Sequence, residues 1–97
     1  MFILFFFSLT YKKPISEVEK FLDKHNQYLD SFYQSGHFIF SGRKEPRIGG
    51  VILCKANSLK EAENIYHNDP FYKNKIADYN VIEFTPTKAN ALFKKII

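Results

Sequence analysis

The sequence contains one cysteine, Cys54, no tryptophan, and only four glycines and four prolines in 97 residues. A single cysteine excludes an intramolecular disulfide and provides no cysteine-based metal site, and it is typical of a reducing compartment. No His-x-x-x-His pair or Cys/His cluster occurs. The Gly49-Gly50 pair lacks the downstream helix that a phosphate-binding loop requires. We therefore expect neither a metal nor a cofactor.

Long apolar stretches are also absent. No segment reaches the roughly 20 apolar residues that are needed to span a bilayer. The opening run, MFILFFFSLT, resembles the apolar region of a signal peptide, but no basic segment precedes it and no Ala-x-Ala cleavage pattern follows it. We expect a cytoplasmic protein that makes no membrane contact.

Positive charge is in mild excess but is not concentrated. The formal net charge is +4 and the pI is near 9.2, yet the lysines are scattered, with pairs only at Lys12-Lys13 and Lys94-Lys95. A nucleic-acid surface needs basic residues that are focused on one face. The charge therefore favours solubility, and we expect no nucleic-acid partner.

Aromatic residues, by contrast, are abundant: eleven Phe and six Tyr make up 18% of the chain. The shares of apolar and charged residues, 45% and 25%, are typical of a globular protein. A chain of this length forms one domain, which we expect over 1–97, with a core at about 1–85 and a tail at 86–97. The chain has more large rings than one small core can bury, which indicates a second buried surface, such as a subunit interface.

Four short runs that are rich in aromatic and β-branched residues predict strands. The predicted strands are Met1–Thr10, His37–Gly42, Gly50–Lys55 and Ala77–Phe84. The first is apolar at almost every position, which is typical of a strand buried on both faces. The loop Arg43–Gly49 joins the second and third strands as a hairpin.

Two segments carry apolar residues in steps of three and four, which predicts helices. The first runs from Ile15 to Tyr33, and Gly36 provides its left-handed C-terminal stop. The second begins at the capping box formed by Ser58 and Glu61 and ends before Pro70, with a short polar connection after it. Thr87 is the predicted cap of a short helix in the tail.

This order of elements is the ferredoxin-like βαββαβ arrangement. It predicts an α+β fold with one antiparallel four-stranded sheet and both helices on one face. Because Met1–Phe7 is wholly apolar, the other face must also be covered, and a homodimer joined sheet to sheet is the simplest cover. RNA-recognition domains share the order and stack bases on strand aromatics, but the strand Gly50–Lys55 contains no aromatic residue.

His25 is the most informative single residue. It lies on the apolar stripe of the first helix, which faces the sheet, and a buried imidazole is costly unless a partner satisfies its nitrogens. That partner is either a backbone carbonyl in a core role or another residue of a functional site. We expect His37 and His67 at the surface or at a helix end.

Asp69 precedes Pro70 at the end of the second helix, where its side chain either shapes the turn or points inward. In a ferredoxin-like domain the two helices lie side by side on the sheet. The chain can therefore bring Asp69 near His25, where a carboxylate that accepts a hydrogen bond from the imidazole would orient the ring for proton transfer.

These residues belong to a longer pattern that resembles the YciI-like (YCII-related) family of the dimeric α+β barrel superfamily. The pattern covers about residues 2–85 and comprises His25 with Tyr28-Leu29, Gly36, Ser41-Gly42, Gly49-Gly50, Ser58-Leu59-Lys60-Glu61-Ala62 and Asp69-Pro70-Phe71. The resemblance implies a ferredoxin-like fold that pairs into a dimeric α+β barrel. It also implies a proposed His–Asp active site, here His25 and Asp69.

The chain departs from the family pattern beside this site. The family commonly has a basic residue at the position of Leu22, and it tends to read Ala-Gly-Pro where this chain has Ser41-Gly42-Arg43. We expect Ser41, Gly42 and Arg43 to bind substrate together with Phe71. Ser41 has no base beside it in sequence and is a donor candidate, and Arg43 either holds a carboxylate or phosphate or is an exposed loop arginine.

The resulting hypothesis is a small-molecule enzyme that uses His25 and Asp69 for proton transfer, of isomerase or lyase type. The alternative is a non-catalytic module that binds a metabolite in the same pocket. Turnover that is lost on substitution of His25 would decide between the two.

Overall fold

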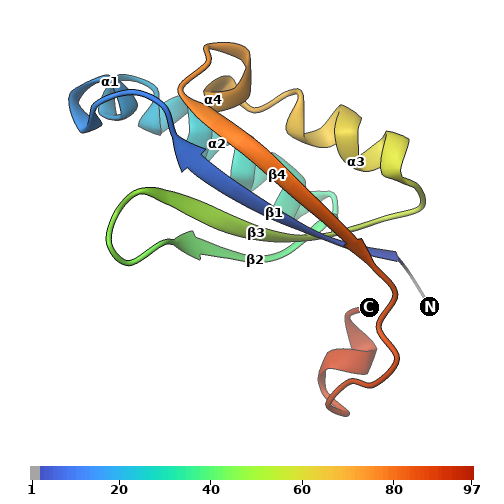
Figure 1. The fold of residues 1–97 in the computed structure, drawn as a ribbon. Helices are drawn as coiled ribbons and strands as arrows, with labels where there is room; N and C mark the ends of the chain where they lie inside the picture. Colours follow the sequence, from blue (N-terminus) through green and yellow to red (C-terminus); the bar gives the residue numbers. More distant parts are fainter. Residues whose placement is uncertain (1–2) are drawn as a thin grey trace.

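A computed structural model describes residues 3–97 of the chain, so Met1 and Phe2, which the sequence places in the first predicted strand, lie outside the described residues. The described part contains four strands, four α-helices and one 3₁₀ turn (Figure 1). In chain order they are β1 (Ile3–Tyr11), α1 (Ile15–Lys20), α2 (Leu22–Gln34), β2 (Phe38–Arg43), β3 (Gly49–Ala56), α3 (Leu59–Tyr66), α4 (Pro70–Lys73), β4 (Ala77–Phe84) and the 3₁₀ turn Phe93–Lys95.

The strands form one antiparallel sheet in the order β2-β3-β1-β4. The helices lie on one face of this sheet (Figure 1). The predicted α+β ferredoxin-like arrangement is therefore confirmed. Residues of β1 alternate between the two faces, and the rings of Phe5 and Phe7 are completely buried under the helices.

The close contact between β3 and its neighbours depends on two glycines. A Cβ at Gly49 would lie 1.8 Å from the carbonyl oxygen of Leu9 on β1, and one at Gly50 would lie 2.9 Å from that of Gly42 on β2. Neither position can accept a side chain without moving the backbone. The Gly49-Gly50 pair is therefore a packing requirement at this end of the sheet.

The prediction of one continuous helix over 15–33 is wrong. The helix is interrupted at Phe21, whose backbone φ and ψ are −109° and 2°, and whose N–H bonds to the carbonyl of Val18. The break allows α1 to bury Val18 completely, while α2 runs on along the sheet with its own buried residues. Gly36, with a φ of +84°, follows α2 in the left-handed conformation that was predicted.

The connection after the third helix also differs from the prediction. Instead of a polar loop it contains the one-turn helix α4, which begins at Pro70. Proline is favoured at the first position of a helix because its missing N–H has no helical partner there. Of the predicted capping box, the bond from the Glu61 N–H to Ser58 Oγ is present, at 3.1 Å.

The C-terminal tail turns back under the sheet, on the face opposite the helices (Figure 1). Phe93 packs edge-on against Phe40 of β2, with ring centres 6.2 Å apart, and Lys55 Nζ donates to the carbonyl of Ile96 at 2.7 Å. Thr87 does not cap a helix, because the only helical turn of the tail begins at Phe93. Asn90 instead accepts from the Leu92 N–H and shapes that turn.

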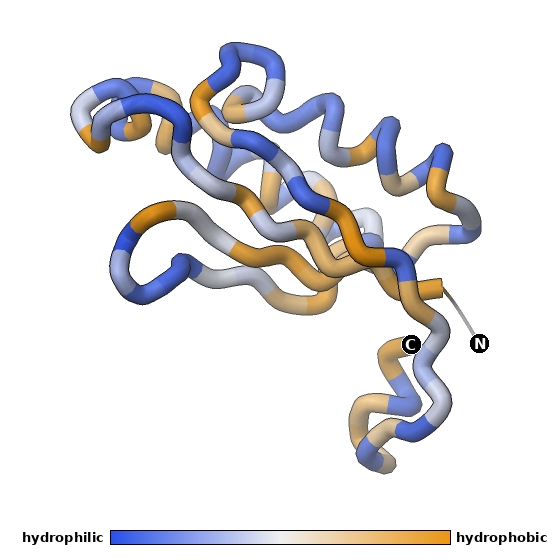
Figure 2. The backbone as a smooth tube through the Cα atoms, viewed as in Figure 1, coloured by the Kyte–Doolittle hydropathy of each residue, from blue (hydrophilic) through white to orange (hydrophobic). Residues whose placement is uncertain are grey.

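The tail leaves part of the open sheet face uncovered. Figure 2 shows apolar stretches on β3 and at the end of β4, above the tail. Phe40, Ile82 and Phe84 on this face are 45%, 54% and 39% exposed. Within residues 3–97, no helix is both long enough and apolar enough to cross a membrane.

Candidate functional site

A pocket of about 210 Å³ opens between α2 and the β2–β3 hairpin. Aliphatic and aromatic side chains form most of its wall, with polar groups from α2 and β2. The lining residues are Leu9, Tyr11, Leu22, His25, Asn26, Leu29, Ser41, Gly42, Arg43, Gly49, Gly50, Val51, Ile52 and Phe71. The predicted substrate-binding residues Ser41, Gly42, Arg43 and Phe71 are thus brought together with His25.

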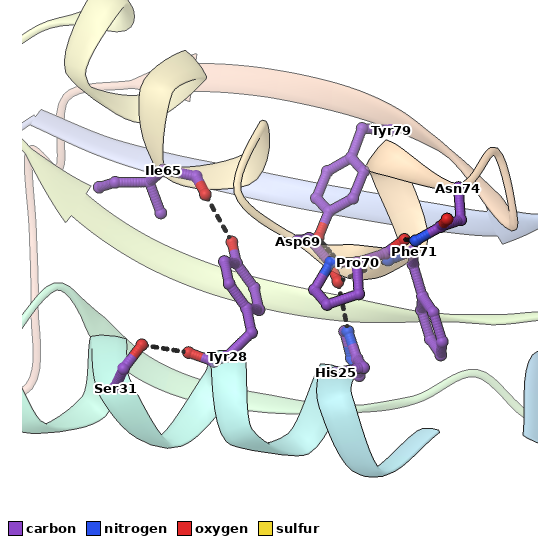
Figure 3. Close-up of polar contacts among 9 residues, drawn as sticks. All are labelled: His25, Tyr28, Ser31, Ile65, Asp69, Pro70, Phe71, Asn74 and Tyr79. Carbon is purple, nitrogen blue, oxygen red and sulfur yellow. Dashed lines mark hydrogen bonds and ion pairs between the residues drawn. The ribbon is translucent and has the colours of Figure 1, made fainter. Parts of the chain in front are cut away.

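His25 of α2 and Asp69 before α4 are in direct contact (Figure 3). Nδ1 of His25 lies 2.8 Å from Oδ1 of Asp69, and both side chains are buried. Because the ionised carboxylate only accepts hydrogen bonds, Nδ1 carries the hydrogen. The contact therefore selects one tautomer of the neutral imidazole, in which Nε2 has a free lone pair.

Asp69 is held by three donors. Its Oδ1 also accepts from the backbone N–H of Phe71 at 2.9 Å, and its Oδ2 accepts from the hydroxyl of Tyr79 on β4. The bond to Phe71 is the N-cap of α4, so the turn role and the inward role that the sequence left open are both filled. These bonds satisfy a carboxylate whose side chain is completely buried.

Phe71 fixes the plane of the imidazole. Its ring stacks on that of His25 with centres 4.0 Å apart and planes within 5° of parallel. Nε2 has no hydrogen-bond partner within residues 3–97. Every fully buried side-chain N or O atom in this part of the chain has a partner, so Nε2 itself is not fully buried. Since His25 lines the pocket, Nε2 is accessible from it.

Two further predicted residues stand on β2 at the pocket rim. Ser41 Oγ lies 2.6 Å from the hydroxyl of Tyr33. Arg43 Nε donates to Glu45 at 3.0 Å, and both side chains are mostly exposed. Arg43 thus lines the pocket and is also exposed, whereas from the sequence a ligand-binding arginine and an exposed loop arginine were alternatives.

A model of the YCII-related domain matches residues 4–85 of the chain, which include every residue of this site. The chain belongs to the YCII-related family. No curated protein matches this YCII-related chain. Among solved structures it is similar to 5-chloro-2-hydroxyhydroquinone dehydrochlorinase (TftG) from Burkholderia phenoliruptrix AC1100, in complex with 2,5-dihydroxybenzoquinone. The two share 18% identity and a TM-score of 0.72, over 84% of this chain and 93% of that one, and at this identity the likeness shows the fold.

Sequence reasoning missed two polar residues of this YCII-related site. Asn26 lines the pocket beside His25, but one residue along a helix is a rotation of about 100°, so the stripe that identified His25 excluded it. Tyr79 donates to Asp69 from β4, ten residues along the chain. The sequence predicts only that Tyr79 lies in a strand, and its role as a donor becomes visible only once Asp69 is placed beside it.

The tyrosines behind the pair remain protonated over a wide pH range. Burial, followed by the negative charge of Asp69, raises the pKa of Tyr79 well above 10.0. The same two causes raise the pKa of Tyr28, whose hydroxyl donates to the carbonyl of Ile65 at 2.9 Å (Figure 3). Tyr79 is therefore a stable hydrogen-bond donor to Asp69.

The other two histidines lie away from the pocket. His37 bonds to Ser35 and to Glu61, and His67 at the end of α3 stacks on Tyr72. No group of three His, Cys, Asp or Glu side chains within residues 3–97 is arranged to hold a metal ion.

Proposed function

We propose that this protein is a small-molecule enzyme in which His25 transfers a proton and Asp69 orients it. The observation that carries the proposal is the arrangement of the imidazole. Nδ1 is bonded to a buried carboxylate at 2.8 Å, while Nε2 faces a pocket of about 210 Å³. A base in this geometry needs only a substrate carbon within hydrogen-bond distance of Nε2.

The chemistry is proton abstraction from a carbon acid. Nε2 takes the proton, and the electrons of the broken C–H bond remain on the substrate as an enolate. Asp69 stabilises the imidazolium that forms, because its negative charge lies beside Nδ1. The proton then returns to another carbon, which is isomerisation, or the electron pair expels a leaving group such as chloride, which is elimination.

The structural neighbour supports a small single-ring molecule as the substrate. By its name TftG removes the elements of hydrogen chloride from a chlorinated hydroxyhydroquinone, and its structure contains a quinone. Both are single-ring molecules. The pocket here is smaller than the range of about 300–1,000 Å³ that drug-sized ligands occupy, which also favours a single small ring.

A turnover screen tests the proposal. Small lactones and haloaromatics are incubated with the protein, and loss of substrate is compared between the wild type, His25→Gln and His67→Gln. We expect turnover that His25→Gln abolishes and that His67→Gln retains, since His67 lies outside the pocket. Binding in the pocket without turnover in the wild type would instead favour the alternative, a non-catalytic metabolite-binding module.

We also propose that two copies associate through the open sheet face. The exposed Phe40, Ile82 and Phe84 support this, because all three lie on the open face of the sheet, and large exposed apolar patches mark protein–protein interfaces. Sedimentation velocity tests it: Ile82→Asp should lower the dimer fraction, whereas Leu59→Asp on α3 should not. A monomeric wild type at 100 μM would contradict it.

A further inference from the structure

We infer that the pocket is selective for a compact monocarboxylate, whose negative group binds Arg43 and whose reacting carbon faces His25. This inference rests on the proposed function and specifies its substrate class. It is carried by the distribution of charge around the pocket, which is strongly asymmetric.

Arg43 is the only Lys, Arg, Asp or Glu residue among the fourteen that line the pocket. The remaining wall is neutral apart from His25, which Asp69 holds with Nε2 unprotonated in its neutral form. One positive charge and no lining carboxylate favour an anionic ligand of a single charge. A guanidinium matches a carboxylate in shape, because two of its parallel N–H groups can bond to both oxygens.

Arg43 retains donors for such a ligand. Its bond to Glu45 uses Nε alone, and a guanidinium has five N–H donors. Both side chains of that pair are more than two-thirds exposed, at 71% and 75%, so the pair contributes little stability. Replacing the Arg43–Glu45 bond by a bond from Arg43 to a ligand carboxylate therefore costs little free energy.

The negative charge of Asp69 sets the orientation of the ligand. This carboxylate lies directly behind His25, so an anion placed at the His25 end would be repelled. The same anion at the Arg43 end is attracted. Leu22, Leu29 and Ile52 line the pocket as well and provide apolar surface for the body of the ligand.

The charge also distinguishes a carboxylate from a phosphate. A phosphate monoester carries up to two negative charges at neutral pH. The pocket offers one cation, and its glycines precede no helix N-terminus of the kind that binds phosphate groups. A monocarboxylate is therefore the better match.

Equilibrium binding of three single-ring probes tests the inference. Benzoate, benzamide and phenyl phosphate are titrated into the full-length protein, and the NMR signals of pocket residues are followed. We expect benzoate to bind about tenfold more tightly than benzamide, which corresponds to one favourable charge contact of about 1.4 kcal/mol. Phenyl phosphate should bind no more tightly than benzoate.

Arginine variants assign the effect to one side chain. Arg43→Gln should abolish the preference for benzoate over benzamide. Arg47→Gln is the matched control, because Arg47 is in the same hairpin, pairs with Glu19 at 3.7 Å and does not line the pocket. It should leave the preference unchanged. Equal affinity for benzoate and benzamide, an equal loss in both variants, or tighter binding of phenyl phosphate would overturn the inference.

The test separates this inference from the proposed function, since binding requires no turnover. His25→Gln should retain the preference for benzoate, because the charged group lies at the opposite end of the ligand. If benzoate is preferred but no carboxylate is turned over, the substrate class stands and the catalytic proposal fails. If turnover is found only for uncharged molecules, the substrate class fails and the catalytic proposal stands.

Discussion

Replacement of Asp69 by alanine should destabilise the protein severely, because three donors depend on one buried carboxylate. His25 Nδ1, the Phe71 N–H and the Tyr79 hydroxyl would all lose their acceptor. A buried donor without a partner costs about 1–3 kcal/mol, and loss of a helix N-cap costs about 1 kcal/mol. We expect a total loss of about 4 kcal/mol or more, a large part of the 5–15 kcal/mol that a typical domain possesses.

The isosteric variant Asp69→Asn should be much less costly. Its amide oxygen can accept the same bonds from His25 and Phe71, and the Tyr79 hydroxyl can rotate to accept from the amide nitrogen. What is lost is the charge, and bonds to charged groups are stronger than neutral ones by about 1 kcal/mol. We therefore expect a loss of about 1–2 kcal/mol, together with loss of any activity that needs a stabilised imidazolium.

Urea unfolding followed by circular dichroism measures both losses. For a slope near 1.5 kcal/mol per molar urea, a loss of 4 kcal/mol lowers the midpoint by about 2.7 M. The control is Asp78→Ala, which removes an exposed carboxylate whose only ion pair within residues 3–97 is with Lys12, at 3.4 Å. The reasoning is refuted if Asp69→Ala shifts the midpoint no further than Asp78→Ala, or if the alanine and asparagine variants are equally stable.

Three further outcomes follow from the contacts described. Tyr79→Phe should cost about 1–3 kcal/mol in the same urea assay, because Asp69 Oδ2 loses its donor; an unchanged midpoint would contradict this. Gly49→Ala should prevent stable folding, whereas Gly42→Ala, with open space around its Cβ, should not, as thermal melts of the pair would show. Burial raises the pKa of the Cys54 thiol from 9.0 to about 12. The unfolded chain therefore loses this proton at a lower pH than the folded protein does. As a result, the free energy of unfolding should fall as pH rises from 9 towards 12, by about 1.4 kcal/mol per pH unit. Cys54→Ala should make that decline shallower, although the buried Tyr28 and Tyr79 still contribute to it above pH 10; parallel pH profiles for the variant and the wild type would show that the thiol contributes nothing.

The topology could be predicted from the sequence because its signals are local. Each strand is a short apolar run, and the left-handed turn at Gly36 and the cap at Ser58 follow from one or two residues. The break at Phe21 could not be predicted, because the apolar spacing continues through it. It is determined by packing, since α1 and α2 bury different residues against the same core.

Only part of the candidate site could be predicted from the sequence. The position of His25 on the apolar stripe indicated a buried imidazole, but its partner is 44 residues away and was identified through the family resemblance. In the sequence, Asn26 looks like an exposed helix residue and Tyr79 looks like an ordinary aromatic residue of a strand. Their roles depend on the distance between elements, which no local pattern encodes.

The positions of Phe71 and of the β2–β3 hairpin have a consequence for how the ligand specificity of such a protein can evolve. Phe71 bonds to Asp69 with its backbone and stacks on His25 with its ring, so the His25–Asp69 pair is fixed within the helical layer. Ser41 and Arg43 belong to the hairpin, on the other side of the pocket. Substitutions in the hairpin can therefore reshape the pocket wall while the pair keeps its geometry, so that the proposed enzyme could acquire new specificities without rebuilding its proposed catalytic pair.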